Sequence, residues 1–208
     1  IVDRPAMIGP ARVQDGDVLI GLASSGLHSN GYSLARKVCT EGKTLYELTI
    51  ARDELEGDSV LDALLEPTRI YVKSIRSVLL QCPGAIHSLA HITGGGITEN
   101  LNRALPSTLD AEIQVGSWNM VPILPWVCRA AHLNETEALK TFNMGLGMIL
   151  AVAPQKAEEV AQLLADAGEE VYIVGQVVPG VGKVVYLDEE ELFAAYSEDE
   201  ESEEDERI

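Results

Sequence analysis

The feature that most constrains this chain is one continuous segment, residues 17–38, in which an apolar run leads into a small polar loop and then into a helical pattern. The apolar residues 18–22 predict a strand that is buried on both faces. The loop reads Ser-Ser-Gly-Leu-His-Ser-Asn over residues 24–30, and residues 31–38 have the spacing of a helix. The segment therefore predicts a strand, a tight polar turn and a helix start.

Such a turn has the chemistry of an oxyanion site. The first N–H groups of a helix have no partner within it, and the helix dipole places positive charge there. Ser29 or Asn30 can cap the helix, while the remaining hydroxyls and amides can point at a phosphate. Ser, Asn and Gly are also the commonest turn residues, so an ordinary strand-to-helix turn closed by an Asn cap is the alternative.

Strands and helices alternate along the rest of the chain. Thr68 is expected to cap the helix at 69–80, and Asn134 with Glu137 has the spacing of a capping box. The alternation predicts a mixed sheet with helices on its faces. Further strands are predicted at 85–92, 111–115, 147–153, 171–177 and 183–187, and helices at 59–65, 69–80, 98–105, 122–131, 134–141 and 154–167.

Charge divides the chain into a body and a tail. Residues 188–206 hold 12 of the 33 acidic residues, which leaves 21 acidic and 14 basic residues in 1–187. We predict a linker at 1–15, one domain at 16–187 and an acidic, disordered tail at 188–208. The tail is interpreted as a solubilising end, with a docking segment for a basic partner as the alternative. Basic residues are not clustered, so no nucleic-acid partner is expected.

The remaining composition points to a cytoplasmic protein. No apolar run approaches the roughly 18 residues that a membrane helix needs, and no secretory signal pattern is visible at the start. The three cysteines, Cys39, Cys82 and Cys128, are odd in number and lack CxxC spacing. They are interpreted as reduced and mostly buried thiols.

Four long motifs, in order along the chain, resemble one enzyme family. They are GDVLIGLASSGLHSNGYSLAR at 16–36, LLEPTRIYV at 64–72, HITGGGITENLNRALP at 91–106 and TFNMGLGMILAV at 141–152. Together they resemble the C-terminal domain of the aminoimidazole ribonucleotide synthetase (phosphoribosylformylglycinamidine cyclo-ligase) family, over roughly residues 8–187. The resemblance implies a three-layer α/β/α domain with a mixed sheet, of the α+β or mixed α/β class.

The resemblance also implies an activity. In this family, ATP activates the formamide oxygen of formylglycinamidine ribonucleotide, an internal nitrogen closes the imidazole ring, and phosphate is released. Members carry an N-terminal domain before this point. That domain supplies most of the binding site for ATP and Mg²⁺ and forms the homodimer. We therefore expect this chain to be the C-terminal, substrate-side half of a purine-biosynthetic ligase. It is expected to bind a phosphoribosyl substrate and to need the missing N-terminal domain as its partner. As a fragment it is expected to have neither a cofactor nor activity of its own.

The same resemblance assigns the first loop to the substrate. Ser24, Ser25, Gly26, Ser29 and Asn30 are expected to lie beside its phosphate or sugar, because small residues admit a phosphate and hydroxyls donate to it. His28 is the expected catalytic residue, as an anion donor or proton shuttle, since imidazole titrates near neutral pH. A packed, hydrogen-bonded loop histidine is the alternative for this residue.

Two further segments complete the predicted site. Thr93, Gly94, Gly95, Gly96 and Glu99 are expected to face nucleotide or phosphate, although the Walker pattern GxxxxGK is absent and three glycines can equally form a tight turn. Glu99 can instead complement a helix N-terminus.

Asn143, at a helix-to-strand junction, is expected to hold an amide or a ribose hydroxyl, with a helix C-cap as its alternative. His87, His91 and His132 are interpreted as structural, and no metal site is expected.

Two other functions stay open on the sequence alone. The chain can be a phosphosugar-binding or interaction module without catalysis. It can also be a related synthetase or kinase, because the domain resembles formylglycinamidine ribonucleotide synthase, selenophosphate synthetase and thiamine-phosphate kinase. The wording HSNGYSLAR and FNMG favours the cyclo-ligase.

Overall fold

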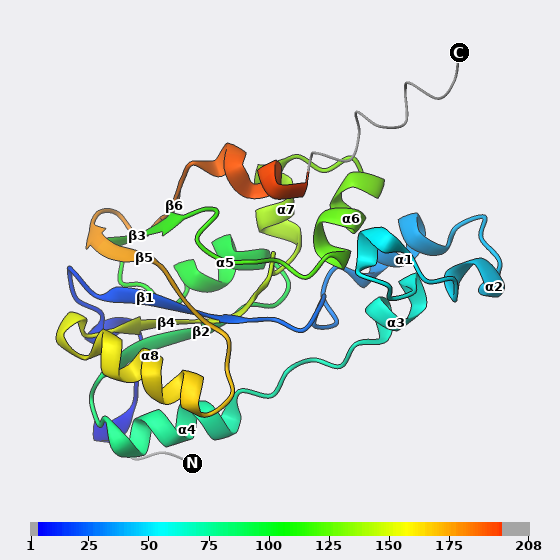
Figure 1. The fold of residues 1–208 in the computed structure, drawn as a ribbon. Helices are drawn as coiled ribbons and strands as arrows, with labels where there is room; N and C mark the ends of the chain where they lie inside the picture. Colours follow the sequence, from blue (N-terminus) through cyan, green and yellow to red (C-terminus); the bar gives the residue numbers. More distant parts are fainter. Residues whose placement is uncertain (1–3, 197–208) are drawn as a thin grey trace.

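A six-stranded mixed sheet forms the centre of the molecule, as seen in a computed structural model that describes residues 4–196 (Figure 1). Its strand order is β2-β4-β1-β5-β3-β6. Neighbouring strands are antiparallel except β3 and β6, which run parallel. The strands are β1 (Val18–Ala23), β2 (Ile86–His91), β3 (Leu109–Gln114), β4 (Leu146–Val152), β5 (Val171–Pro179) and β6 (Val184–Leu187).

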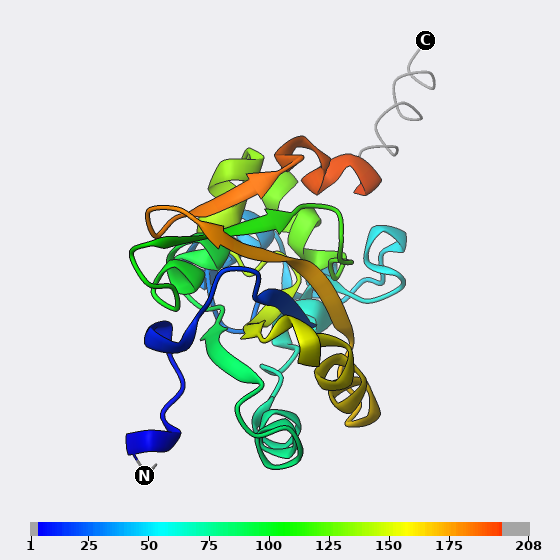
Figure 2. The same cartoon turned by 90° about the vertical axis from the view of Figure 1, so that its left-hand side faces the viewer.

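Helices cover both faces of this sheet. On one face α4 (Val72–Gln81) and α8 (Ala157–Asp166) lie side by side (Figure 2). On the other lie α5 (Gly96–Asn102), α6 (Ile123–Ala130) and α7 (Glu135–Thr141). The predicted three-layer mixed fold is confirmed.

The central strand β1 explains how one sheet supports two cores. Successive side chains of a strand point to opposite faces. Leu19 packs into the core under α5, α6 and α7, whereas Ile20 and Leu22 pack into the core under α4 and α8. All three side chains are buried, as the continuous apolar run of this strand predicts.

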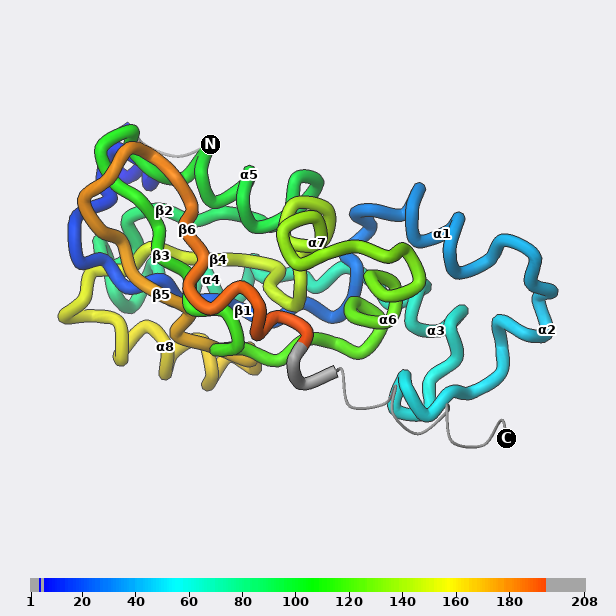
Figure 3. Tube along the Cα trace, turned by 90° about the horizontal axis from the view of Figure 1, so that it is seen from above, coloured from blue at the N-terminus to red at the C-terminus, as the bar shows by residue number. Residues whose placement is uncertain are grey.

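Three helices project beyond one end of the sheet, as Figure 3 shows, and carry the chain away from β1 and back to α4. They are α1 (Tyr32–Thr40), α2 (Leu45–Leu48) and α3 (Val60–Leu65). Short 3₁₀ turns complete the chain: η1 (Arg4–Ala6), η2 (Pro10–Arg12), η3 (Asp53–Leu55), η4 (Pro154–Lys156) and η5 (Glu189–Tyr196).

The predicted helix caps are correct in part. Ser59 caps α3, and Asn134 with Glu137 forms the capping box of α7. Ser29 and Asn30 do not cap α1, because Gly31 is the N-cap residue, with φ of 69° and no side-chain cap. Thr68 does not cap a helix either, since α4 begins only at Val72. The short helix α2, opened by its own capping box at Thr44, was not predicted.

The chain end differs from the predicted tail. The predicted tail begins at residue 188. Residues 189–196 instead form η5, which packs on α7 and buries Leu192 in the core. Leu192 and the partly buried Phe193 pack against the core, and Thr136 Oγ1 donates to Glu189 Oε1, so this acidic turn is held on the domain. The rest of the predicted disordered tail, 197–208, lies outside the described residues.

None of the helices within residues 4–196 has the length and apolar character needed to cross a membrane. Cys39, Cys82 and Cys128 are all buried thiols without a disulfide, as their spacing predicts.

Candidate functional site

The loop at residues 24–30 follows the C-terminal end of β1 and has a buried and an outward side. Ser24 and His28 are buried, whereas the side chain of Ser29 is exposed to solvent. His28 and Ser29 both have positive φ, of 52° and 59°. Two consecutive non-glycine residues in the left-handed region are uncommon, and such backbone strain concentrates at functional sites.

Asn143 holds the buried side of this loop. Its Oδ1 accepts from Ser24 Oγ at 3.1 Å and from the Gly145 backbone N–H at 2.9 Å, and its Nδ2 donates to Gly26 O at 2.8 Å. The side chain has no exposed surface. In this structure Asn143 therefore fixes the loop from beneath, and its polar atoms are occupied by protein groups.

The residues around Asn143 form a template for the same loop. A Cβ on Gly31 would lie 2.2 Å from the ring of Phe142, so the helix start can pack there only as glycine. A Cβ on Gly147 would lie 2.0 Å from Tyr71 Oη and 2.7 Å from His28 Cε1. The motif at residues 141–147 is thus explained by close packing against residues 24–31 and Tyr71.

His28 is held by backbone groups. Its Nε2 accepts from the Ser25 N–H at 3.0 Å and from the Arg69 N–H at 3.3 Å. Ser25 Oγ is also 3.0 Å from Nε2, but it donates its hydrogen to Pro67 O at 2.8 Å. With Nε2 as an acceptor, the proton of the neutral ring is on Nδ1. Nδ1 is buried and has no hydrogen-bond partner among residues 4–196.

The environment of His28 keeps the imidazole neutral. Burial, followed by the nearby charges of His91 and Arg69, lowers the pKa of His28 from 6.5 to about 4. A general base that works near neutral pH needs a pKa close to 7. In this state His28 is suited to hydrogen bonding, and the proposed proton shuttle would require a different environment.

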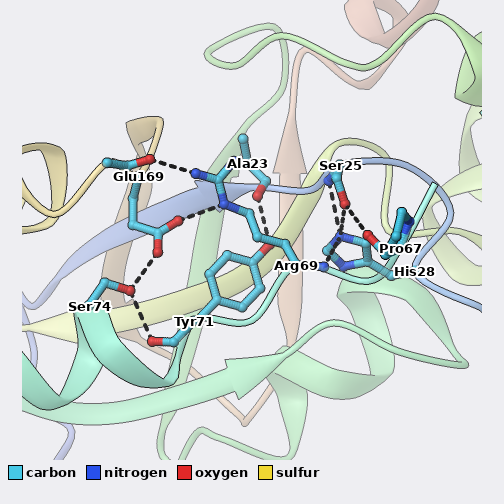
Figure 4. Close-up of polar contacts among 9 residues, drawn as sticks. Ala23, Ser25, His28, Pro67, Arg69, Tyr71, Ser74 and Glu169 are labelled. Atoms are coloured by element: carbon cyan, nitrogen blue, oxygen red, sulfur yellow. Dashed lines mark hydrogen bonds and ion pairs between the residues drawn. The ribbon is translucent and has the colours of Figure 1, made fainter.

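A second polar cluster fixes the segment that covers His28, which we call the strap (residues 66–71). Figure 4 shows Arg69 reaching Glu169, which follows α8: Arg69 Nε lies 2.8 Å from Glu169 Oε2, and Nη2 donates to Gly168 O at 2.6 Å. Tyr71 Oη donates to Ala23 O at 2.6 Å. The strap is therefore tied to β1 at one point and to the turn between α8 and β5 at another.

The outward side of the loop lies next to the three glycines at the start of α5, of which Gly96 is the first residue of the helix. A Cβ on Gly94 would have a single neighbour, Asn30 Oδ1 at 3.9 Å. Gly94 is exposed, and its φ is not positive. The fold thus brings all three predicted site segments together, with Asn143 on the buried side of the loop, and the surface between Asn30 and Gly94 is open.

The other two glycines are required by the turn itself. Gly95 has φ of 94° and caps α5, and Gly96 has φ of 61°. A Cβ on Gly96 would lie 2.1 Å from the backbone oxygen of Leu139. Asn100 Nδ2 donates to the carbonyls of Gly94 and Gly96 at 3.1 and 2.8 Å, and its Oδ1 accepts from Thr93 Oγ1 at 3.1 Å.

Predicted Glu99 lies on the exposed face of α5. Arg103 Nε donates to the Glu99 carbonyl at 2.9 Å, and the two side chains form a loose ion pair at 3.9 Å. His91 is exposed beside the same turn and is close enough to His28 to influence its pKa. Glu99 and Thr93 thus border the glycine turn, while Asn143 lies on the opposite, buried side of the loop.

Two cavities flank these residues. One, of about 350 Å³, lies between η2, β2 and α5 and includes His91, Asn100 and Arg103. The other, of about 310 Å³, includes Ser25 together with four acidic residues in or beside α3: Glu56, Asp58, Asp62 and Glu66. Within residues 4–196, no group of three or more His, Cys, Asp or Glu side chains is arranged to hold a metal ion.

Sequence reasoning missed the residues that support the loop from the strap. Arg69 and Tyr71 lie within the motif LLEPTRIYV, but a helix pattern was predicted there. Glu169 carries no local signal, because its partner Arg69 is 100 positions away. His87, predicted to be structural, pairs with the buried carboxylate of Asp17 at 2.7 Å. Asp17 directly precedes β1, so this pair lies at the other end of the strand from the loop.

Comparison with known proteins identifies the domain. Residues 14–188 match the family described as AIR synthase related protein, C-terminal domain. A phosphoribosylformylglycinamidine cyclo-ligase of Brevibacillus brevis is 46% identical over 188 residues, 89% of this chain and 53% of that protein. The enzyme of the same name from Lactobacillus delbrueckii subsp. bulgaricus is 45% identical over 85% of this chain and 50% of its own length. The chain spans about half the length of these curated relatives.

Solved structures share the fold at low sequence identity. Thiamine-monophosphate kinase from Stenotrophomonas maltophilia has a TM-score of 0.58 and 16% identity, covering 89% of this chain and 54% of the kinase. PurL of T. maritima, solved in complex with FGAR, has a TM-score of 0.51 and 13% identity, covering 86% of this chain and 26% of PurL. These likenesses support the architecture alone.

Proposed function

This chain belongs to the family of AIR synthase related protein C-terminal domains, and from that premise we propose that it is the substrate-side half of a phosphoribosylformylglycinamidine cyclo-ligase. The observation that carries the proposal is the 40–46% identity to enzymes of that name over at least 85% of this chain. The reaction would be the ATP-dependent closure of formylglycinamidine ribonucleotide to aminoimidazole ribonucleotide, in the biosynthesis of purines.

The proposed ligand surface lies between the outward side of the loop and the glycine turn. Ser29 offers a free hydroxyl and Asn30 an amide oxygen, while Gly94 leaves room for a ligand to approach the backbone. A phosphoribosyl group carries phosphate oxygens that can accept from the Ser29 hydroxyl, and sugar hydroxyls that can donate to Asn30 Oδ1. The chain's contribution would be positioning and charge stabilisation, which is the main task of a protein in phosphoryl transfer.

ATP and Mg²⁺ are assigned to the full-length enzyme. The described residues contain no ready cluster of metal ligands, and the Walker pattern is absent. We therefore assign most of both sites to the half that the relatives have in addition to the region matched by this chain. On this proposal the 208-residue chain alone does not close the ring, and the complete enzyme is a cytoplasmic homodimer.

Titration calorimetry of formylglycinamidine ribonucleotide into the isolated chain tests the proposed surface. Ser29→Ala is expected to weaken binding by about tenfold or more, because it removes a hydrogen bond to a charged group. Ser77→Ala on α4, at the opposite face of the sheet, is the matched control and is expected to bind normally. Equal affinities of the wild type and Ser29→Ala would remove the loop from the site.

A further inference from the structure

We propose that His28 is a fixed hydrogen-bond donor to the ligand, and that Glu169 is a positioning residue that acts through Arg69 to keep the imidazole proton on Nδ1. The inference rests on the proposed function for the identity of the ligand. The tautomer of His28, by contrast, follows from contacts within this chain alone.

Nε2 of His28 is occupied by two hydrogen-bond donors. Two backbone N–H groups, from Ser25 and Arg69, converge on this atom at 3.0 and 3.3 Å. A ring nitrogen that accepts hydrogen bonds carries no proton, so the neutral ring must be protonated at Nδ1. The tautomer is therefore set by the backbone positions of residues 25 and 69 and not by a side-chain carboxylate.

The position of the Arg69 backbone depends on Glu169. The Arg69 backbone belongs to the strap, and its side chain anchors the strap at Glu169 Oε2 and Gly168 O. Ser74 Oγ, at 2.5 Å from Glu169 Oε1, holds the carboxylate from the other side. The Glu169 side chain is only 7% exposed, so this ion pair is shielded from water on one side. Removing the carboxylate is expected to release the strap and with it the Arg69 N–H.

The remaining polar atom of the His28 ring, Nδ1, has no partner among the residues that the structure describes. Nδ1–H is a buried donor without a partner in the described part of the chain, in a residue that is 3% exposed. An unsatisfied buried donor is costly, and native proteins rarely retain one without a reason. The strained residues 28 and 29 make the same loop expensive to maintain. An acceptor oxygen supplied by the ligand, reached after a small shift of the loop, accounts for both features.

Nuclear magnetic resonance of the ¹⁵N-labelled chain tests the tautomer without any ligand. Long-range ¹H–¹⁵N correlations are expected to show His28 protonated at Nδ1 only, and Glu169→Gln is expected to give a mixture of tautomers. Glu159→Gln is the control, because it removes the ion pair with Lys156, at 2.7 Å, near the start of α8, whereas Glu169 follows the end of that helix. If Glu169→Gln does not fold, Arg69→Lys serves in its place. Two results would overturn the inference: protonation of His28 at Nε2 in the wild type, or an unchanged tautomer in a folded Glu169→Gln or Arg69→Lys chain.

Addition of formylglycinamidine ribonucleotide tests the donor. The Nδ1 resonance of His28 is expected to shift, and His28→Asn is expected to lose about tenfold or more in affinity. His132→Asn is the control, since His132 also has positive φ, of 53°, but lies in the turn before α7. Binding without a shift of Nδ1 would overturn the donor role and leave the proposed function intact. No binding by the wild type would contradict the proposed function and the donor role together, while the tautomer would still be decided by the free chain.

Discussion

Asn30 Oδ1 lies 3.9 Å from the position that a Cβ on Gly94 would take, and apart from Thr93, Gly94 and Gly95 themselves no other heavy atom of the described residues comes within 4 Å of that position. The two residues belong to motifs far apart in the sequence, and the fold places them on one open surface. Gly94 therefore differs from the next two glycines, whose positive φ values are needed by the turn. Because of this difference, substitution of Gly94 tests whether a ligand approaches the surface, whereas substitution of Gly96 tests the backbone conformation of the turn.

Gly94→Val is expected to leave the free energy of unfolding within about 1 kcal/mol of wild type, because the new side chain enters open space at an ordinary φ. Its affinity for formylglycinamidine ribonucleotide is expected to fall sharply, because the same space would receive the ligand. Urea denaturation and calorimetry measure the two effects. Normal binding by a folded Gly94→Val chain would show that the open surface is not used.

Gly96→Val is the contrasting variant. Its Cβ would lie 2.1 Å from the Leu139 backbone oxygen, and its φ of 61° is unfavourable for a β-branched residue. Strain and overpacking together are expected to cost roughly 2–6 kcal/mol. Unfolding midpoints in urea check this expectation, and a midpoint like that of wild type would contradict the assignment of Gly96 to the turn.

Asn143→Ala is expected to destabilise the chain by about 2–4 kcal/mol, because it leaves buried partners at Ser24, Gly26 and Gly145 unsatisfied. Asn134→Ala is the control: it removes an exposed helix cap, which typically costs about 1 kcal/mol. The two variants are compared by thermal and urea unfolding. A stable Asn143→Ala chain with weakened ligand binding would instead support direct contact between Asn143 and substrate, as predicted from the sequence.

Stability should fall as the pH is lowered from about 6.5 towards 4. Burial lowers the pKa of His28 to about 4 in the folded chain, whereas the unfolded ring titrates near 6.5. Between these values the unfolded state binds one more proton, so acid favours unfolding, by up to about 3 kcal/mol below pH 4. The difference in unfolding free energy between wild type and His28→Asn should therefore depend on pH across this window. A constant difference would show that His28 titrates normally.

Truncation separates the η5 turn from the residues that follow it. Removing 197–208, which contain eight acidic residues and little apolar surface, should change the melting temperature by about 2 °C or less. Removing 189–208 also deletes Leu192, which is 3% exposed in the core, and should lower it by several degrees. Scanning calorimetry compares the two truncations, and equal melting temperatures would show that η5 adds no stability.

The fold was largely predictable because its signals are local. Buried strands such as β1 are continuous apolar runs, and the caps of α3 and α7 require only residues three positions apart. The errors occurred where tertiary contacts override such signals. Thr68 looked like a helix cap, but Arg69 is held in an irregular strap by Glu169 and by His28.

The candidate site was predictable as segments but not as roles. Asn143 and Ser29 are both polar residues in family motifs, yet one is enclosed by backbone groups and the other faces solvent. The three glycines look equivalent in the sequence, and only their φ values and neighbours distinguish Gly94. Such distinctions depend on packing between segments that are distant in the sequence, as between Asn30 and Gly94 or between Gly96 and Leu139, which no local pattern encodes.

The most direct measurement is the activity of a chimera in which this chain replaces the C-terminal half of the 46% identical Brevibacillus brevis cyclo-ligase. We predict ATP-dependent formation of aminoimidazole ribonucleotide by the chimera, its loss in the chimera that carries Gly94→Val, and none by the 208-residue chain alone. A folded chimera that forms no aminoimidazole ribonucleotide, measured beside an active parent enzyme, would contradict the assignment of this chain as the substrate-side half of a cyclo-ligase.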